Sequence, residues 1–155
     1  MNAINATNPI SAINTMNAMK IRVLITDDHP QFRRALRYFL ELDPALEIIG
    51  EASSGEQACR MAQAGRAQLV CVDWRMAEMN GVETIEHLLS VMPHIKIIAL
   101  SAGFEDGVET AMLAAGASRY INKEHVSDQL LPAIHALFPE PQADSTAQHA
   151  CGTAP

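Results

Sequence analysis

The sequence predicts an α/β fold, a doubly wound, five-stranded parallel sheet with helices on both faces. Two observations support this prediction. Five short apolar segments alternate along the chain with five segments whose apolar residues recur at the helical spacing. In addition, the central apolar segment, residues 68–73, is continuous rather than alternating, as in strands that are buried on both faces. Strands that alternate with helices favour right-handed βαβ units and a parallel sheet.

The five apolar segments, which we assign as strands, are short and are bounded by turn-forming or polar residues. They are residues 21–26, 46–51, 68–73, 95–100 and 118–122. The helices between them are indicated by their starts and stops. Pro30 suits a first helical turn, and Ser54 with Gln57 has the spacing of a capping box. A third helix begins at Gly81, and Pro93 ends it.

The last two helices carry weaker signals. Asp106 and Glu109 resemble a second capping box, and Gly65 and Gly116 are expected to stop the second and fourth helices. The last helix, about residues 127–138, contains Pro132 deep inside it. We therefore expect this helix either to begin late or to bend at the proline.

Composition limits the classes of function. The chain has 155 residues, enough for one domain, and 48% of them are hydrophobic. Its net charge of −7 disfavours direct binding to nucleic acid or to an anionic membrane. The three cysteines lack metal-ligand spacing, and the sequence contains neither an apolar run long enough to span a membrane nor an export signal. These features favour a reducing, cytoplasmic location. We expect residues 1–19 to form a disordered leader, residues 20–138 the domain, and residues 139–155 a disordered tail.

Polar side chains follow the ends of four predicted strands. Asp27 and Asp28 follow the first strand, Asp73 ends the third, Ser101 follows the fourth and Lys123 follows the fifth. The carboxyl ends of parallel strands meet at one edge of the sheet, which is where open α/β sheets bind ligands. We therefore expect three carboxylates, a hydroxyl and an ammonium to share one crevice.

Three carboxylates in one crevice favour a bound cation. At about 5 Å and an effective dielectric near 20, each pair repels by about 3 kcal/mol. Oxygen ligands of this kind suit Mg²⁺. We expect Asp28 and Asp73 to bind it directly, Asp27 to bind through water, and the backbone carbonyl of Arg75 to complete the set.

With its charge balanced in this way, Asp73 can attack phosphorus as an oxygen nucleophile. Lys123 would then stabilise the transferring phosphoryl group, although a purely structural ion pair with the acids would place it in the same position.

At this point the sequence resembles a known family. Residues 20–138 are similar to the receiver domain of two-component response regulators, in the variety attached to LuxR/FixJ-type DNA-binding regulators. The motifs that carry the resemblance are Ile-Thr-Asp-Asp-His-Pro ending at Pro30, Asp73-Trp-Arg-Met-x-x-Met-x-Gly81, Leu-Ser101-Ala, and Tyr120-Ile-Asn-Lys123. They occur in the family's order and spacing.

The resemblance implies a flavodoxin-like (βα)5 sheet with strand order 2-1-3-4-5. It also implies that Asp73 accepts a phosphoryl group from a sensor histidine kinase or a phosphotransfer protein, with Mg²⁺ as cofactor, and that Lys123 binds the phosphate. Ser101 and Tyr120 would form the switch pair. The output would be contact with a downstream protein through the face of the fourth helix, fifth strand and fifth helix, or a homodimer, without a separate enzymatic activity.

The sequence departs from the family pattern at three places. Ala77 stands where proline is common, and Trp74 stands beside the phosphoacceptor where a smaller aliphatic residue is commoner. Trp74 would either fill the core or crowd the site. Too few residues follow Phe138 for an output domain, which predicts a stand-alone receiver.

Several alternatives remain open. A phospho-independent adaptor would keep the fold and use its surface constitutively, and a relay intermediate or phosphate sink would pass the phosphoryl group on. A hydrolase of the haloacid-dehalogenase type would need Asp-x-Asp after the first strand, where this chain has Asp27-Asp28-His29. A flavin site is excluded, because the loop after the first strand offers carboxylates where a phosphate would need backbone amides.

The basic residues and histidines carry weaker signals. Arg33, Arg34 and Arg37 form either a solvated basic face or a surface that attracts an acidic kinase. None of the six histidines has ligand spacing, so we take them as incidental, although His29 is near the pocket.

Overall fold

The computed structural model describes residues 19–139 and shows the expected parallel sheet. Its five strands lie in the order β2-β1-β3-β4-β5, the flavodoxin-like order, and every neighbouring pair is parallel. The strands are β1 (Ile21–Thr26), β2 (Leu46–Ala52), β3 (Leu69–Asp73), β4 (Lys96–Ser101) and β5 (Arg119–Asn122). Each predicted strand is present, with ends that differ by at most one residue. The predicted leader and tail, with Cys151, lie almost wholly outside the described residues.

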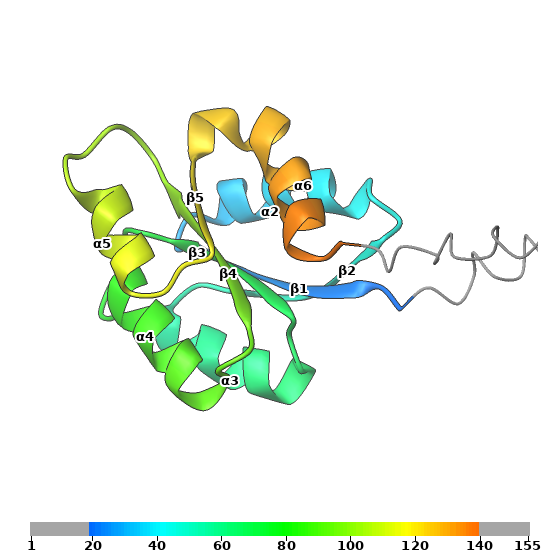
Figure 1. Ribbon diagram of the computed structural model, residues 1–155, viewed down its shortest axis with the longest axis horizontal. Coiled ribbons are helices and arrows are strands. Elements are labelled where there is room, and N and C mark those ends of the chain that lie inside the picture. Colours follow the sequence, from blue (N-terminus) through cyan, green and yellow to red (C-terminus); the bar gives the residue numbers. More distant parts are fainter. Residues whose placement is uncertain (1–18, 140–155) are drawn as a thin grey trace, which may run out of the picture.

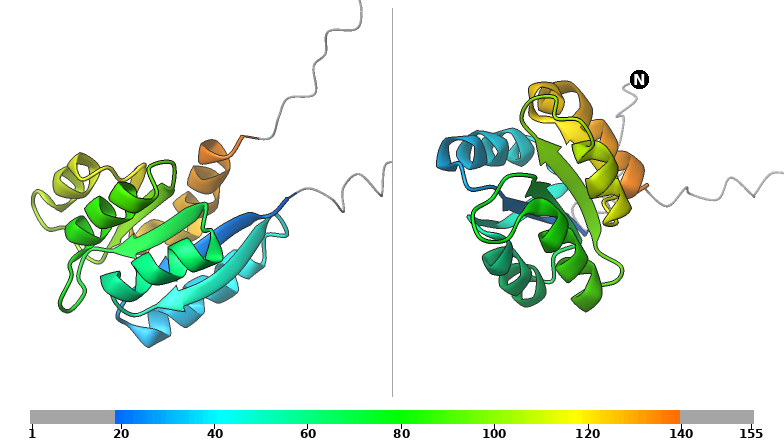
Figure 2. Two further views of the ribbon diagram at one scale, coloured as in Figure 1. Left: turned by 90° about the horizontal axis from the view of Figure 1, so that it is seen from below. Right: turned by 90° about the vertical axis from the view of Figure 1, so that its left-hand side faces the viewer.

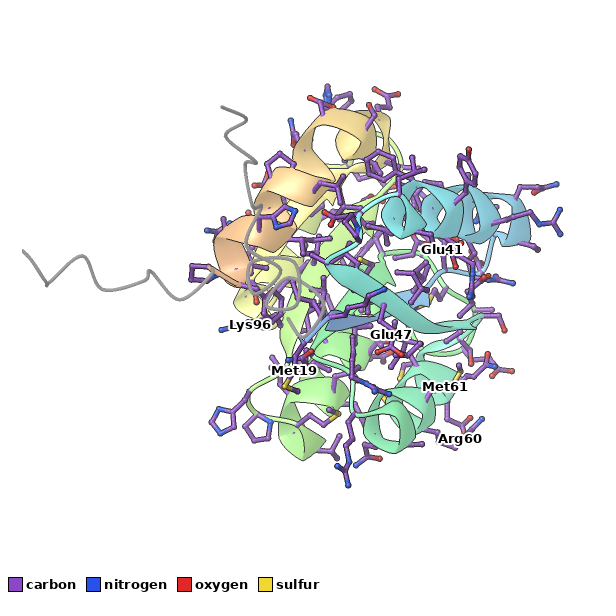
Figure 3. The ribbon with its side chains drawn as sticks, turned by 90° about the vertical axis from the view of Figure 1, so that its right-hand side faces the viewer. Met19, Glu41, Glu47, Arg60, Met61 and Lys96 are labelled. Carbon is purple, nitrogen blue, oxygen red and sulfur yellow. The ribbon has the colours of Figure 1, made fainter. Side chains whose placement is uncertain are left out.

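Helices cover both faces of the sheet. They are α2 (Pro30–Glu41), α3 (Gly55–Gly65), α4 (Gly81–Val91), α5 (Val108–Ala114) and α6 (Val126–Leu137), the last preceded by a short 3-10 turn, η1 (Lys123–His125). Helices α2 and α6 lie on one face, and α3, α4 and α5 lie on the other (Figures 1 and 2). Figure 3 looks onto the β2 edge of the sheet, with α2 above it and α3 below it. The fold is therefore three layers with one apolar core on each side of the sheet.

The central strand β3 belongs to both cores because its side chains alternate between the two faces. Val70 and Val72 pack beneath α3 and α4, whereas Leu69 and Cys71 pack beneath α2 and α6. All four are fully buried. Burial raises the pKa of the Cys71 thiol to about 12. This accounts for the continuous apolar run that the sequence shows at this strand.

Helix starts follow their capping residues. Ser54 accepts a hydrogen bond from the backbone N–H of Gln57, as predicted. A full capping box forms at α4, where the side chains of Asn80 and Glu83 each accept from the other's backbone N–H. The capping box predicted at Asp106 is wrong. Helix α5 starts one residue later, after Gly107, whose φ of +84° provides the turn without a side-chain cap.

The ends of α3 and α6 show two further details. Helix α3 ends at Gly65, as predicted, although the residue that takes the left-handed conformation after it is Arg66, with φ of +50°. A Cβ at Gly65 would lie 2.7 Å from Cδ1 of Ile49, so glycine permits close packing on β2. Helix α6 runs through Pro132 without interruption, so the late start considered for it is wrong.

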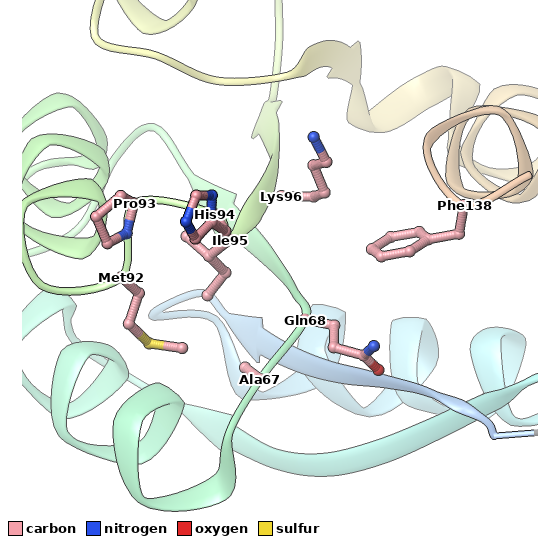
Figure 4. A pocket seen from close by; sticks show the side chains of 8 residues that line it. All are labelled: Ala67, Gln68, Met92, Pro93, His94, Ile95, Lys96 and Phe138. Carbon is pink, nitrogen blue, oxygen red and sulfur yellow. The ribbon is translucent and has the colours of Figure 1, made fainter.

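A shallow hollow of about 440 Å³ opens where β3 and β4 begin. It is lined by Ala67, Gln68, Met92, Pro93, His94, Ile95, Lys96 and Phe138 (Figure 4). It therefore lies at the amino ends of the strands, opposite the edge at which Asp73 stands. In residues 19–139, none of the helices combines the length and the apolar character needed to cross a membrane.

Candidate functional site

Lys123 joins two buried carboxylates at the carboxyl edge of the sheet. Its Nζ lies 2.5 Å from Oδ2 of Asp27 and 2.8 Å from Oδ1 of Asp73. Asp27 is fully buried, Asp73 is 3% exposed, and the Lys123 side chain is 12% exposed. One cation is thus shared by two buried acids, and with Asp28 beside them the pocket keeps an excess of negative charge.

The strand register explains why these residues meet. Thr26, the last residue of β1, pairs with Val72, so Asp27 and Asp73 stand at the same level on adjacent strands. On the other side, Asp73 pairs with Leu100 of β4, and Ser101 pairs with Asn122 of β5. Ser101 therefore stands one step beyond Asp73, and Lys123, which follows Asn122, stands two steps beyond it.

Local contacts hold Lys123 in this position. Asn122 is buried; its side-chain oxygen accepts from the N–H of Glu124, and its side-chain nitrogen donates to the carbonyl of Gly103. The turn that begins at Lys123 is fixed by these two bonds. In addition, the Lys123 ammonium lies 4.2 Å from the ring centre of Phe32 on α2, a cation–π distance.

The protonation of Asp73 is shifted by its surroundings. Burial raises the pKa of Asp73 to about 6, the hydrogen bond from Lys123 opposes this rise, and the negative charges of Asp27 and Asp28 add to it. An added cation near these acids would favour the charged form of Asp73. The unbalanced charge is thus the electrostatic basis for a cation at this edge.

The acidic residues after β1 have the right chemistry for Mg²⁺. Ligand atoms of Asp27, Asp28 and His29 all lie within 4.8 Å of one another. Both Asp27 oxygens already accept hydrogen bonds, Oδ2 from Lys123 and Oδ1 from the N–H of His29. Asp28 is more exposed, and its Oδ1 is 2.8 Å from Nδ1 of His29. A carboxylate set of this kind fits Mg²⁺, with Asp28 more accessible than Asp27.

The remaining predicted site residues do not join the Lys123 network. Ser101 is buried, and its hydroxyl donates to the carbonyl of Ala102 at 3.4 Å. Tyr120 is half-buried and packs against the core beneath α4 and α5. The guanidinium of Arg75 is exposed and forms an ion pair with Glu105. The half-buried Trp74 packs against the core, and its indole N–H donates to Glu105 at 3.3 Å.

Three residues near the pocket were not assigned a role from the sequence. His29 contacts both acids after β1, Asn122 holds the Lys123 turn, and Glu105 joins the loops after β3 and β4. A histidine directly after an acidic pair is a signal for His29. The signals for the other two exist only in three dimensions.

The basic residues of α2 prove to be largely neutralised within the chain. The Arg33 side chain donates to the Asp27 carbonyl and faces Glu51 at 3.5 Å, while Arg37 pairs with both Glu41 and Glu51. Of the three, only Arg34 is exposed. Helix α2 therefore does not present a face of unpaired, solvated arginines.

Comparisons with known proteins identify the family. The model of the response regulator receiver domain matches residues 23–135. Among curated proteins, the chain is 31% identical to the transcriptional regulatory protein DegU of Brevibacillus brevis, over 79% of this chain and 52% of that protein. It is 34% identical to the nitrate/nitrite response regulator protein NarL of Escherichia coli, over 73% of this chain and 52% of that protein. The chain thus spans about half the length of these relatives.

Solved structures agree with this result. The signal receiver domain of the putative response regulator NarL from Mycobacterium tuberculosis matches with a TM-score of 0.71 and 26% identity, over 76% of this chain and 95% of that one. The response regulator domain of Thermotoga maritima CheB matches with a TM-score of 0.70 and 25% identity, over 79% and 99%. The family model matches residues 23–135, and the order of the strands agrees with it. The chain therefore belongs to the response regulator receiver domain family, whose members are signalling phosphoacceptors.

Proposed function

We propose that the chain is a Mg²⁺-dependent phosphoacceptor in which Asp73 takes a phosphoryl group from a sensor histidine kinase or a phosphotransfer protein. The observation that carries the proposal is the buried bridge of Lys123 between Asp27 and Asp73. It places an ammonium beside an almost fully buried carboxylate at the edge where strand ends bind ligands. The phosphorylated form would signal through protein contacts.

In the proposed step, the free oxygen of the Asp73 carboxylate attacks the phosphorus of a phosphohistidine. A new P–O bond forms as the P–N bond breaks, and its electron pair leaves with the imidazole nitrogen, which takes up a proton from solvent. The Lys123 ammonium contacts Oδ1 of Asp73, so it can move to the phosphoryl oxygens and stabilise their negative charge as the bond forms. Asp28 and Asp73 with the Arg75 carbonyl would hold Mg²⁺ directly, and Asp27 through water. Mg²⁺ would supply charge neutralisation for the attacking and phosphoryl oxygens.

The switch would use Ser101 and Tyr120. The Ser101 hydroxyl makes one long bond to Ala102, so little is lost when it turns to a phosphoryl oxygen. A hydrogen bond to a charged acceptor is worth about 1.5 to 3 kcal/mol, and a contact from Lys123 adds a similar amount. Together they approach the roughly 5.5 kcal/mol that swings a two-state equilibrium from 1:99 to 99:1. Tyr120 would then move inward and change the face formed by α5, β5 and α6.

The test is phosphorylation by a small donor. The whole chain is incubated with Mg²⁺ and acetyl phosphate, and its intact mass is measured. We expect one added phosphoryl group, lost in Asp73→Asn and lost when a chelator removes Mg²⁺. Asp106→Asn makes the same chemical change on the exposed β4–α5 loop and serves as the control.

The outcome also separates the alternatives. A folded wild-type chain that gains no phosphoryl group would contradict the proposal and favour a phospho-independent adaptor. An Asp73→Asn variant that still gains one would contradict the assignment of Asp73 as the acceptor. A phosphoryl group that forms on Asp73 but moves promptly to an added phosphotransfer protein would favour a relay intermediate or a phosphate sink.

A further inference from the structure

Glu105 joins the loop after the phosphoacceptor to the loop after the switch serine. Its carboxylate accepts the indole N–H of Trp74 through Oε2 and forms an ion pair with the Arg75 guanidinium through Oε1. Trp74 and Arg75 directly follow Asp73, and Glu105 lies four residues beyond Ser101. We call these three residues, Trp74, Arg75 and Glu105, the Glu105 clasp.

The loop that carries Glu105 has few other attachments. Residues 102–107 are all exposed, and Phe104 is 83% exposed. Gly103 and Gly107 flank the tip with φ of +77° and +84°, and a Cβ at either position would meet no atom within 4 Å. The base is held by the bond from Asn122 to the Gly103 carbonyl. Within residues 19–139, the side-chain hydrogen bonds and ion pairs between the tip of this loop and the loop after Asp73 all involve Glu105.

The clasp also neutralises the positive charge of the Arg75 guanidinium. Lys123 is committed to Asp27 and Asp73, whereas Arg75, two residues after Asp73, is neutralised by Glu105. A phosphoryl group on Asp73 would add close to two negative charges and three acceptor oxygens. Arginine binds phosphoryl oxygens better than it binds a single exposed carboxylate, because the charge is larger and the fork of N–H donors fits it. Phosphorylation therefore competes with Glu105 for Arg75.

We propose that Glu105 is a positioning residue that restrains the unmodified state, an inference that rests on the proposed phosphorylation of Asp73. Glu105 keeps Arg75 away from the phosphoacceptor and ties down the loop whose base holds Ser101. On phosphorylation, Arg75 leaves Glu105 for the phosphoryl oxygens. The β4–α5 loop, with the exposed Phe104 at its tip, is then free to follow Ser101 toward Asp73.

The main test compares Glu105→Gln with Glu109→Gln in the whole chain. Both substitutions remove one negative charge, but Glu109 lies exposed on α5 and forms no ion pair with any of the described residues. With Mg²⁺ and limiting acetyl phosphate, we expect the ratio of phosphorylated to unmodified Glu105→Gln to rise about two- to fivefold, the range that loss of one exposed ion pair allows. Glu109→Gln should match the wild type.

A double variant shows whether Glu105 acts through Arg75. We expect Arg75→Gln to lower the phosphorylated ratio, and Arg75→Gln/Glu105→Gln to equal Arg75→Gln alone, because Glu105 then has no cation to withhold. A spectroscopic readout follows the loop itself. Trp74 is the single tryptophan, so its indole N–H gives one proton resonance. It should shift when the wild type is phosphorylated, and in Glu105→Ala it should lie displaced before any donor is added.

The outcomes distinguish this inference from the proposed function. If the wild type and all variants fail to take up a phosphoryl group, the proposed function fails. If the wild type is phosphorylated but Glu105→Gln and Glu109→Gln behave alike, or the double variant keeps the full gain, the clasp inference is overturned while the proposed function stands. A gain specific to Glu105→Gln that vanishes without Arg75 supports it.

Discussion

Replacing the carboxylate of Asp73 by an amide should stabilise the protein at neutral pH when no divalent cation is present. The pKa of Asp73 is raised from 3.8 to about 6, chiefly by burial. One pKa unit corresponds to about 1.4 kcal/mol, so keeping this side chain charged costs the folded state about 2 to 3 kcal/mol. A neutral amide at this position would not carry that cost, and Lys123 would keep its partner Asp27. We therefore expect Asp73→Asn to raise the free energy of unfolding by about 2 kcal/mol.

The pH dependence gives the sign of the effect. A carboxyl group whose pKa is higher in the folded state than in the unfolded state destabilises the fold at pH values above its folded pKa. The cost is fully present above about pH 6 and disappears as the pH falls toward the unfolded value near 4, because both states then hold the proton. The advantage of Asp73→Asn should shrink across the same range.

Urea unfolding followed by circular dichroism measures this difference. The wild type, Asp73→Asn and the surface control Asp106→Asn are compared in a chelator near pH 7.5 and near pH 4.5. Added Mg²⁺ should stabilise the wild type more than Asp73→Asn, because it lowers the cost of the charge. The reasoning is refuted if Asp73→Asn is no more stable than the wild type near pH 7.5 without metal, or if its advantage persists unchanged in acid.

Three further substitutions follow from the contacts around the site. Lys123→Met leaves two buried carboxylates without their cation, so the free energy of unfolding near pH 7.5 should fall by about 3 to 5 kcal/mol in urea titrations, with a smaller loss in acid. Gly81→Ala would bring a Cβ within 2.6 Å of the Asp73 carbonyl oxygen, so its melting temperature should drop by several degrees for a loss of about 1 to 3 kcal/mol, and an unchanged value would contradict the packing. Asn80→Ala removes the α4 cap and should cost about 1 kcal/mol, a loss that should not add to that of Glu83→Ala if the two form one capping box.

The sheet was predictable because its signals are local. A strand buried on both faces must be apolar throughout, and the polar residue that ends it marks the carboxyl edge, as Asp73 does for β3. The strand order follows only from the family resemblance, since the periodicity and burial of a segment do not specify which strands are its neighbours. The wrong start for α5 has a local cause, because the left-handed Gly107 replaced the side-chain cap expected from Asp106. The capping box at Asn80 and Glu83 is visible in the sequence but was not predicted.

The candidate site was predictable as a set of positions, but its contacts were not. Parallel topology alone brings Asp27, Asp73 and Lys123 to one edge. That the Lys123 ammonium contacts both Asp27 and Asp73 cannot be predicted from the sequence, because this contact depends on the turn that the Asn122 side chain stabilises. The contacts of Glu105 depend likewise on two loop conformations that no pattern in the sequence encodes.

The buried thiol on the central strand provides a way to observe rare openings of the native sheet. Alkylating reagents attack the thiolate, and Cys71 is both fully enclosed and shifted to a pKa of about 12. Its modification therefore requires β3 to separate from its neighbours, two residues before Asp73. The alkylation rate of Cys71 in native buffer therefore measures how often the central strand separates from its neighbours. A slower rate after addition of acetyl phosphate would show, without any denaturant, that this opening has become rarer.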